Sequence, residues 1–219
     1  MKGTDSALPQ QVFLTGTDTD VGKTLVAASL LLADPQRSYW KPVQSGAAQD
    51  TDTGWIRRVT GLSAQRLYPE HTVLQAPLSP HIAAAREGAL VQVQDIFPPP
   101  GADTAPLLIE GAGGVLVPLN EQQTMLDLML HLQAPVLVVA RSTLGTINHS
   151  LLTVRVLRQA GLKVWGVVFS GPPDPKAMES VRHFGEVSRT AVLPWLEKRG
   201  PGELAEHGKR LLSTLGGQQ

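Results

Sequence analysis

The sequence predicts an α/β protein: a single three-layer domain with a mainly parallel, doubly wound sheet and helices on both faces. Short apolar runs rich in Val, Leu and Ile alternate with segments of helical period along the 219 residues, which is typical of buried parallel strands joined by helices. The first apolar run also ends in a glycine-rich turn that leads into a helix-compatible segment. A hydrophobic share of 42% is enough for one substantial core.

The elements follow from this alternation in chain order. Predicted strands, each an apolar run, lie at 12–14, 38–43, 105–109, 135–140, 163–169 and 190–194. Predicted helices, each of helical period, lie at 25–32, 55–59, 125–132, 147–159, 175–187 and 203–215. Residues 1–10 are polar and predict a flexible N-terminal arm, so the domain is expected to span 11–219. Ligands of such sheets bind beyond the carboxyl ends of the strands, and residues following each strand are therefore candidates for chemistry.

Composition excludes several classes of function. The formal net charge is zero and no basic run is present, so neither nucleic acid nor an anionic membrane is an expected partner. The chain has no cysteine, which excludes disulfides, thiolate catalysis and cysteine metal sites. The first residues do not resemble a signal peptide and no apolar run reaches membrane-spanning length. A cytoplasmic protein that acts on small molecules is expected.

The turn at Gly16–Thr24 has the composition and position of a phosphate-binding loop, or P-loop. Its strand, glycine turn and helix direct backbone N–H groups and the positive end of a helix dipole at one point, where a polyphosphate can bind. Lys23 would then reach the outer phosphates and Thr24 would ligate Mg²⁺. These features predict a P-loop NTPase-like fold. A structural turn with a solvated lysine is the alternative interpretation.

The spacing within this loop is unusual. Five residues, rather than the usual four, separate Gly16 from Gly22, and two of them, Asp18 and Asp20, are acidic. Carboxylates beside bound phosphates repel them unless a cation or a metal is near. We therefore infer that the loop also serves a positively charged partner.

A second candidate site element follows the apolar run 107–109. Glu110 comes directly after that run and precedes Gly111–Gly114, which predicts a carboxylate at the tip of a buried strand. This arrangement resembles a Walker B element, whose acidic residue holds Mg²⁺ directly or through water. The alternative is a glutamate that caps a turn.

A third group of polar residues follows the strand predicted at 38–43. Lys41 could neutralise a transferring phosphoryl group, while Asp50 or Asp52 could complete a Mg²⁺ shell. Asp52–Thr53 could equally serve as the N-cap of the helix predicted at 55–59. The residues alone leave both uses open.

Six segments of the chain resemble, in order, segments of the dethiobiotin synthetase family, and together they span nearly its whole length. These segments are Gly16–Thr24, Lys41–Gly46, Ser79–His81, Glu110–Gly114, Leu144–His149 and Pro194–Leu196. The resemblance implies a Mg²⁺- and ATP-dependent ring closure of 7,8-diaminononanoate with CO₂ or bicarbonate to dethiobiotin, ADP and phosphate, in biotin biosynthesis. It also implies a carbamate and then a carbamic-phosphoric anhydride as intermediates. Positioning and charge stabilisation would carry most of the rate.

The resemblance also implies roles for individual residues. Lys23 and Lys41 would be catalytic, balancing charge on the γ-phosphate, and Thr24, Asp52 and Glu110 would serve the metal. The implied nucleotide-binding residues are Asp20, Val21, Gly22, Lys23, Thr24, Leu25, Asp52, Glu110, Gly111, Ala112, Gly113, Ser170, Pro194, Trp195 and Leu196.

Substrate binding is implied for two parts of the chain. Thr19 and Ser45 would contact the diamine or its carbamate. Because the diamine substrate is cationic, it would explain the acidic Asp20 in the loop. Gly145 and Asn148 would hold the substrate carboxylate of the other subunit across a two-fold interface, which implies a homodimer; a helix N-terminus suits a carboxylate. Asn148 as a simple N-cap is the alternative.

The chain departs from the family at one position. Many members end the strand corresponding to 164–169 with an asparagine that recognises adenine, whereas this chain has Ser170. A single hydroxyl cannot make the paired hydrogen bonds of an amide. We expect ATP as co-substrate, with backbone groups near Ser170 and Pro194–Leu196 recognising the base and other nucleoside triphosphates accepted as well.

Two other classes of protein share the predicted fold. A cobyrinic acid-type amidotransferase needs a cysteine nucleophile, which this chain lacks. A partitioning or septum-positioning switch ATPase usually carries an additional lysine early in the loop, where this chain has Thr17 and Asp18. The synthetase interpretation is therefore preferred, and substrate-independent ATP hydrolysis would favour the switch ATPase.

Overall fold

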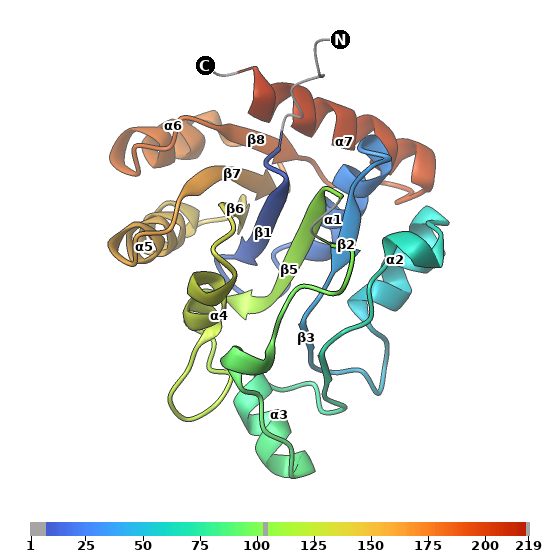
Figure 1. The fold of residues 1–219 in the computed structure, drawn as a ribbon. Helices are drawn as coiled ribbons and strands as arrows, with labels where there is room; N and C mark the ends of the chain where they lie inside the picture. Colours follow the sequence, from blue (N-terminus) through green and yellow to red (C-terminus); the bar gives the residue numbers. More distant parts are fainter. Residues whose placement is uncertain (1–7, 103–104, 218–219) are drawn as a thin grey trace.

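The computed structural model describes residues 8–102 and 105–217, and these form a sheet between two layers of helices (Figure 1). Six parallel strands make the sheet in the order β2-β5-β1-β6-β7-β8. The strands are β1 (Gln11–Gly16), β2 (Ser38–Trp40), β5 (Leu107–Gly114), β6 (Val136–Arg141), β7 (Val164–Ser170) and β8 (Thr190–Leu193). Because the chain winds outward from β1 in both directions, the predicted doubly wound α/β class is confirmed.

Helices cover both faces of this sheet. In the described residues they are α1 (Lys23–Ala33), α2 (Asp52–Thr60), α3 (Pro80–Glu87), α4 (Met125–Leu132), α5 (Thr146–Gln159), α6 (Pro175–Phe184) and α7 (Pro201–Gly216). α1, α2 and α7 lie on one face, and α4, α5 and α6 on the other (Figure 1). No helix in these ranges has both the length and the apolar character needed to cross a bilayer.

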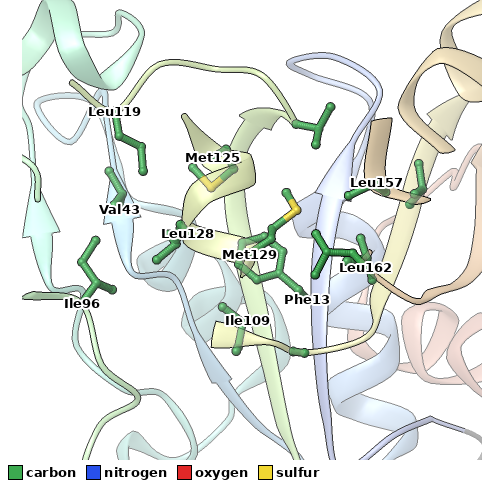
Figure 2. Close-up of a cluster of buried hydrophobic side chains, with 14 of the residues drawn as sticks. Phe13, Val43, Ile96, Ile109, Leu119, Met125, Leu128, Met129, Leu157 and Leu162 are labelled. Atoms are coloured by element: carbon green, nitrogen blue, oxygen red, sulfur yellow. The ribbon is translucent and has the colours of Figure 1, made fainter. Parts of the chain in front are cut away.

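The pleat of the strands divides the core between the two faces. In β1, Phe13 packs with Met129 and Leu157 of α4 and α5 (Figure 2), whereas Val12 and Leu14 belong to the cluster under α1 and α7. Successive side chains of a strand point to opposite faces, so a strand covered on both sides must be apolar throughout. This explains the uninterrupted apolar runs of the sequence.

A glycine sets the distance between α1 and α7. A Cβ atom added to Gly208 of α7 would lie 1.9 Å from the carbonyl oxygen of Ser29 in α1. No side chain fits in that space, so the two backbones are in direct contact. The contact fixes α7 over the helix that carries the phosphate-binding loop at its start.

The strand predicted at 38–43 is interrupted. β2 ends at Trp40, and Val43–Gln44 form a separate short strand, β3, which pairs in parallel with β4 (Thr72–Val73). Lys41 and Pro42 lie at the break; proline has no N–H to donate to a sheet. Two short 3₁₀ segments, Ala64–Arg66 and Val93–Asp95, complete the described elements.

The strand predicted to end before Glu110 continues to Gly114. The prediction of Glu110 at a strand tip is therefore wrong: it lies within β5, opposite Leu14 of β1. Glycine has low strand propensity, which is why the strand was expected to end before the glycine run. Here glycine is required by space, because a Cβ on Gly111 would lie 2.8 Å from the Phe13 ring.

The predicted N-terminal arm is only partly visible. Its residues 1–7 lie outside the described part of the chain. Leu8 is buried, and the carbonyl oxygens of Pro9 and Gln10 accept hydrogen bonds from the guanidinium of Arg37 at 3.1 and 3.4 Å. The described end of the arm thus packs against the domain.

Candidate active site

A cavity of about 1110 Å³ opens at the carboxyl edge of the sheet. It is lined by the loop after β1, by β3 and the start of α2, by β5, and by residues that follow β6, β7 and β8. The predicted residues that line it are Thr19, Asp20, Val21, Gly22, Lys23, Thr24, Leu25, Lys41, Ser45, Asp52, Glu110, Ala112, Gly113, Ser170 and Trp195. Residues far apart in the sequence therefore meet in one site.

The phosphate-binding loop curls around its own lysine. Lys23 is buried, and its ammonium donates to the Asp18 carbonyl oxygen at 3.2 Å. Gly22 precedes α1 with φ 95°, and a Cβ there would lie 2.5 Å from the Ser170 hydroxyl, so both backbone and space require glycine. Burial lowers the Lys23 pKa, although Glu110 opposes this.

The acidic loop residue Asp18 pairs with an arginine of the same chain, so the positively charged partner inferred for this loop stays a prediction. Arg141, at the end of β6, donates to the Asp18 carboxylate at 2.6 Å, and both side chains are partly exposed. Arg141 also lines the cavity. Sequence reasoning did not select it, because an arginine after an apolar strand has no characteristic spacing to a loop more than a hundred residues earlier.

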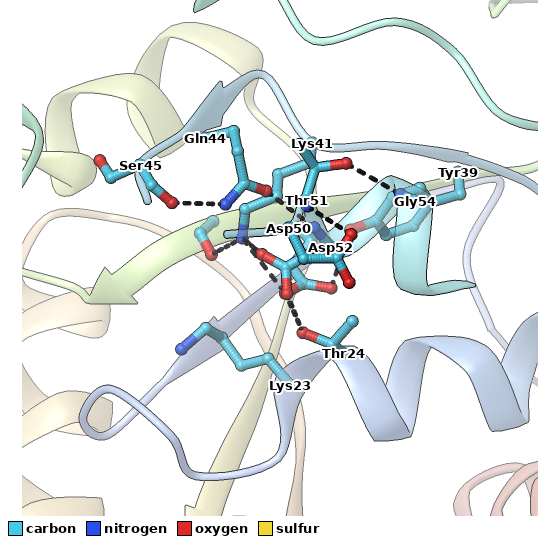
Figure 3. A network of polar contacts seen from close by, with 12 residues as sticks. Lys23, Thr24, Tyr39, Lys41, Gln44, Ser45, Asp50, Thr51, Asp52 and Gly54 are labelled. Carbon is cyan, nitrogen blue, oxygen red and sulfur yellow. Dashed lines mark hydrogen bonds and ion pairs between the residues drawn. The ribbon is translucent and has the colours of Figure 1, made fainter. Parts of the chain in front are cut away.

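Two carboxylates, a hydroxyl and an ammonium form the floor of the cavity (Figure 3). The Thr24 hydroxyl lies 2.7 Å from Asp52 Oδ1 and 3.0 Å from Glu110 Oε1. Lys41 Nζ lies 2.8 Å from Asp52 Oδ2 and 3.3 Å from Glu110 Oε1, and it also donates to the Gly111 carbonyl oxygen at 3.5 Å. We call these four side chains the carboxylate cluster.

In this cluster, burial and ion pairing shift the pKa values of the charged groups in opposite directions. Burial would lower the Lys41 pKa, but Glu110 and Asp52 outweigh it, so the pKa is raised and the lysine stays charged. Burial raises the pKa of Glu110 against the opposing charge of Lys41. The more exposed Asp52 has a lowered pKa, because Lys41 more than offsets its desolvation. The cluster holds a stable positive charge beside two carboxylates.

The start of α2 separates two aspartates that the sequence could not distinguish. Asp50 pairs with Arg58 on the outside of α2, whereas Asp52 points into the carboxylate cluster. The N-cap is Thr51, whose hydroxyl accepts the Gly54 N–H at 2.9 Å, so the predicted cap at Asp52–Thr53 is wrong. Asp52 is thereby free to contact Thr24 and Lys41.

A buried glutamine holds this helix start in place. The Gln44 side-chain oxygen accepts the Asp52 N–H at 3.0 Å, and its amide donates to the Ser45 carbonyl oxygen at 2.6 Å. Gln44 was not predicted as a site residue; its position in the Lys41–Gly46 segment was the available signal. Gln44 thus links β3 to the start of α2.

The donor set of the carboxylate cluster fits Mg²⁺. It offers only oxygen ligands: two carboxylates and one hydroxyl. Mg²⁺ is usually bound by one or two carboxylates, with waters and substrate phosphates completing its shell. No group of three His, Cys, Asp or Glu residues suited to a metal occurs in the described ranges. The cluster therefore suits a metal that arrives with a polyphosphate better than one held by protein alone.

The wall of the cavity next to Lys41 carries further hydroxyl groups. Ser45 and Thr19 both line it. The Ser45 Oγ atom is buried and has no hydrogen-bond partner among the described residues. A buried polar group without a partner costs free energy, which a bound ligand would recover.

Two predicted substrate residues lie outside this cavity. Gly145 and Asn148 are exposed at the start of α5 and are not among the lining residues. Gly145, with φ 95°, is itself the N-cap of α5, so the alternative interpretation of Asn148 as a cap is wrong. Within one chain, neither residue meets the carboxylate cluster.

Three predicted nucleotide residues also do not line the cavity. Gly111 is buried behind it and contributes its carbonyl oxygen to Lys41, while Leu196 is buried and Pro194 lies at the end of β8. Their neighbours Ala112 and Trp195 line it instead.

The far end of the cavity lies beside β7 and β8. Trp195 is 75% exposed, and Ser170, Pro172 and Arg199 line the cavity with it. The Glu203 carboxylate of α7 accepts the N–H groups of residues 197–199 at 2.9–3.3 Å, which holds this loop. Arg199 was not predicted.

The chain is similar to proteins of known family. Residues 10–202 match a family model described as an AAA domain. The chain is 48% identical to the ATP-dependent dethiobiotin synthetase BioD of Paramagnetospirillum magneticum, over 80% of this chain and 83% of that protein. It is 45% identical to the BioD of a Bradyrhizobium species, over 86% and 89%.

Among solved structures, the cell division ATPase MinD of Pyrococcus furiosus aligns with a TM-score of 0.58 at 15% identity, covering 94% of this chain and 98% of MinD. A ParA family ATPase of Chlorobium tepidum aligns with a TM-score of 0.53 at 9% identity, covering 94% and 97%. At such low identity, these two show the shared fold alone.

Proposed function

We propose that this chain, a member of the ATP-dependent dethiobiotin synthetase family, joins 7,8-diaminononanoate to CO₂ with Mg²⁺ and ATP. The members of this family are ATP-dependent ligases of biotin biosynthesis. One observation carries this proposal beyond the family name: the carboxylate cluster and Lys23 face the same cavity as the unpartnered Ser45 hydroxyl. This arrangement supports a cavity that binds a metal–polyphosphate together with a polar second substrate.

The reaction would proceed in three steps. One amine of the substrate attacks CO₂, forming an N–C bond and losing a proton to give a carbamate. A carbamate oxygen then attacks the γ-phosphorus, and the bond to ADP breaks. Finally the second amine attacks the carbamoyl carbon, closing the ring and expelling phosphate.

The side chains of the site supply charge and position for these steps. Lys41 would turn from its carboxylates to the transferring phosphoryl group, and Lys23 would neutralise the outer phosphates. Thr24, Asp52 and Glu110 would hold Mg²⁺, which neutralises developing phosphate charge when bound. Thr19 and Ser45 would orient the carbamate, and the main contribution would be alignment.

We further propose that the chain acts as a homodimer. Gly145 and Asn148 lie outside the cavity of their own chain, beside the exposed apolar side chains of Leu144 and Ile147. This geometry supports a role toward a second copy, in which the start of α5 would receive the substrate carboxylate of the partner subunit.

The test is product formation followed by mass spectrometry. Purified protein is incubated with 7,8-diaminononanoate, bicarbonate and Mg-ATP, and dethiobiotin is measured for the wild type, Lys41→Ala and, as control, the exposed Lys209→Ala. We expect a loss of at least about 100-fold for Lys41→Ala, since donors at developing charge are worth about 10²–10³ in kcat. The control should match the wild type. Absence of dethiobiotin with steady ATP hydrolysis would overturn the proposal in favour of a switch ATPase.

A further inference from the structure

Tyr39 is a fully buried tyrosine whose hydroxyl is directed at the carboxylate cluster. It lies in β2, opposite Leu108 of β5, and is 0% exposed. Because side chains two residues apart share a face of a strand, Leu108 lies on the same face of β5 as Glu110. Strand pairing thus places the phenol beside the Glu110 carboxylate.

The two oxygens of Glu110 have different partners. Oε2 accepts a hydrogen bond from the Tyr39 hydroxyl at 3.1 Å, while Oε1 contacts Thr24 at 3.0 Å and Lys41 at 3.3 Å. The phenol therefore fixes the plane of the carboxylate and leaves Oε1 directed at the side chains that face the cavity. Burial, and then the charge of Glu110, raise the Tyr39 pKa well above its usual value, so the hydroxyl remains a donor.

Tyr39 approaches this carboxylate from the protein side. Glu110, Thr24 and Lys41 line the cavity, whereas Tyr39 does not. It therefore does not face a nucleotide or a diamine there, and its hydroxyl reaches the carboxylate cluster through Glu110.

We propose that Tyr39 is a positioning residue that orients Glu110 for Mg²⁺ in the nucleotide complex. The inference rests on the metal role proposed above for Glu110. Outer partners of metal ligands orient them and typically change metal affinity or activity by about 10–100-fold when removed. The binding step that should respond is Mg²⁺ uptake with the nucleotide, rather than nucleotide binding itself.

The chain offers a matched control, because it has two tyrosines. Tyr39→Phe removes the hydroxyl and retains the ring, and Tyr68→Phe makes the same change at a partly buried tyrosine away from Glu110. ADP binding to full-length protein is measured by calorimetry from EDTA to excess Mg²⁺. For Tyr39→Phe, we expect the Mg²⁺ concentration that gives half of the increase in ADP affinity to rise about 10-fold or more. The ADP affinity measured in EDTA should be unchanged. Tyr68→Phe should match the wild type.

Equal Mg²⁺ requirements in Tyr39→Phe and the wild type would overturn the role of Tyr39 alone. An equal loss of ADP binding with and without Mg²⁺ would also overturn it, since the residue would then support only the fold. If ADP binding by the wild type does not depend on Mg²⁺, the proposed metal role fails first, and this inference fails with it.

A second measurement avoids dependence on the folding of Tyr39→Phe. In a Tyr68→Phe background grown with 3-fluorotyrosine, the remaining fluorine lies on Tyr39 alone. We expect its NMR signal to shift when Mg²⁺ is added to the ADP complex, because Glu110 exchanges Lys41 for the metal. An unshifted signal, with ADP and Mg²⁺ both bound, would contradict the proposal.

Discussion

At the scale of single residues, position relative to a helix start decides function more than residue type does. Asp50 and Asp52 are two residues apart, yet one pairs with Arg58 at the surface and the other enters the carboxylate cluster. The sequence could place both near the site, but it could not place the first turn of α2. Both aspartates line the cavity, and only Asp52, which follows the N-cap Thr51, joins the carboxylate cluster.

This difference predicts opposite results for two identical substitutions. Asp52→Asn should lower dethiobiotin formation by at least about 100-fold, because metal ligation contributes several kcal/mol of charge stabilisation. Asp50→Asn should remain within about twofold of the wild type, because exposed ion pairs contribute little. Initial rates at saturating substrates measure both. Similar losses in the two variants would contradict the assignment of Asp52 to the metal.

The base end of the cavity leads to a second prediction at this scale. At the end of the cavity beside β7 and β8, the large exposed ring of Trp195 lies with Ser170, Pro172 and Arg199, and stacking on an aromatic ring accepts every base. We expect ATP, GTP, CTP and UTP to support turnover with kcat/KM values within about tenfold, and Trp195→Ala to raise KM for all four in similar proportion. A competition series with dethiobiotin as readout measures this. A strict preference for ATP would contradict it.

At the scale of elements, a neighbouring strand can require glycine where a local pattern would not predict a strand. The sequence predicted that the strand ends before Glu110, but β5 continues along β1 to Gly114. A Cβ on Gly111 would lie 2.8 Å from the Phe13 ring, so no side chain fits there. Strand propensity is a local property, whereas this requirement comes from a neighbour about a hundred residues away, so the sequence pattern could not reveal it.

The contact between α1 and α7 gives a stability prediction. Gly208→Ala places a methyl group against the backbone of Ser29, which no rotamer can avoid, and it should reduce the free energy of unfolding by about 1–3 kcal/mol. This loss exceeds the gain of about 1 kcal/mol in helix propensity. Gly202→Ala, in the first turn of α7 with open space around it, is the control and should be neutral or stabilising. Urea unfolding measures both, and equal stability of the two variants would refute the explanation.

At the scale of the whole molecule, the sequence predicted the layers and most strands but not the sheet order. Apolar runs such as 135–140 identify buried strands, and the P-loop identifies β1, because both signals are local. Packing between distant segments places β5 between β1 and β2, and it brings Arg141 to Asp18. Helix α3 was missed although Pro80 and Gly88 mark its ends, because it is short and weakly periodic.

The proposed dimer gives a prediction at this same scale. Leu144 is fully exposed beside Gly145, and Leu144→Glu should halve the mass seen by light scattering and raise KM for the diamine. The reason is that a charge in an apolar contact must be desolvated without a partner. Leu90→Glu changes another exposed leucine, and it should leave mass and KM unaltered. A monomeric wild type with full activity would contradict the shared site.

The bridging position of Lys41 also has a consequence for the order of events. One ammonium is shared by the two carboxylates of the cluster and partly neutralises both. A bare divalent ion entering there would approach this buried ammonium, which repels it. If a triphosphate accompanied the ion, its phosphates would offer Lys41 a new anionic partner as the carboxylates turned to the metal. We therefore expect Mg²⁺ to bind together with the nucleotide rather than alone.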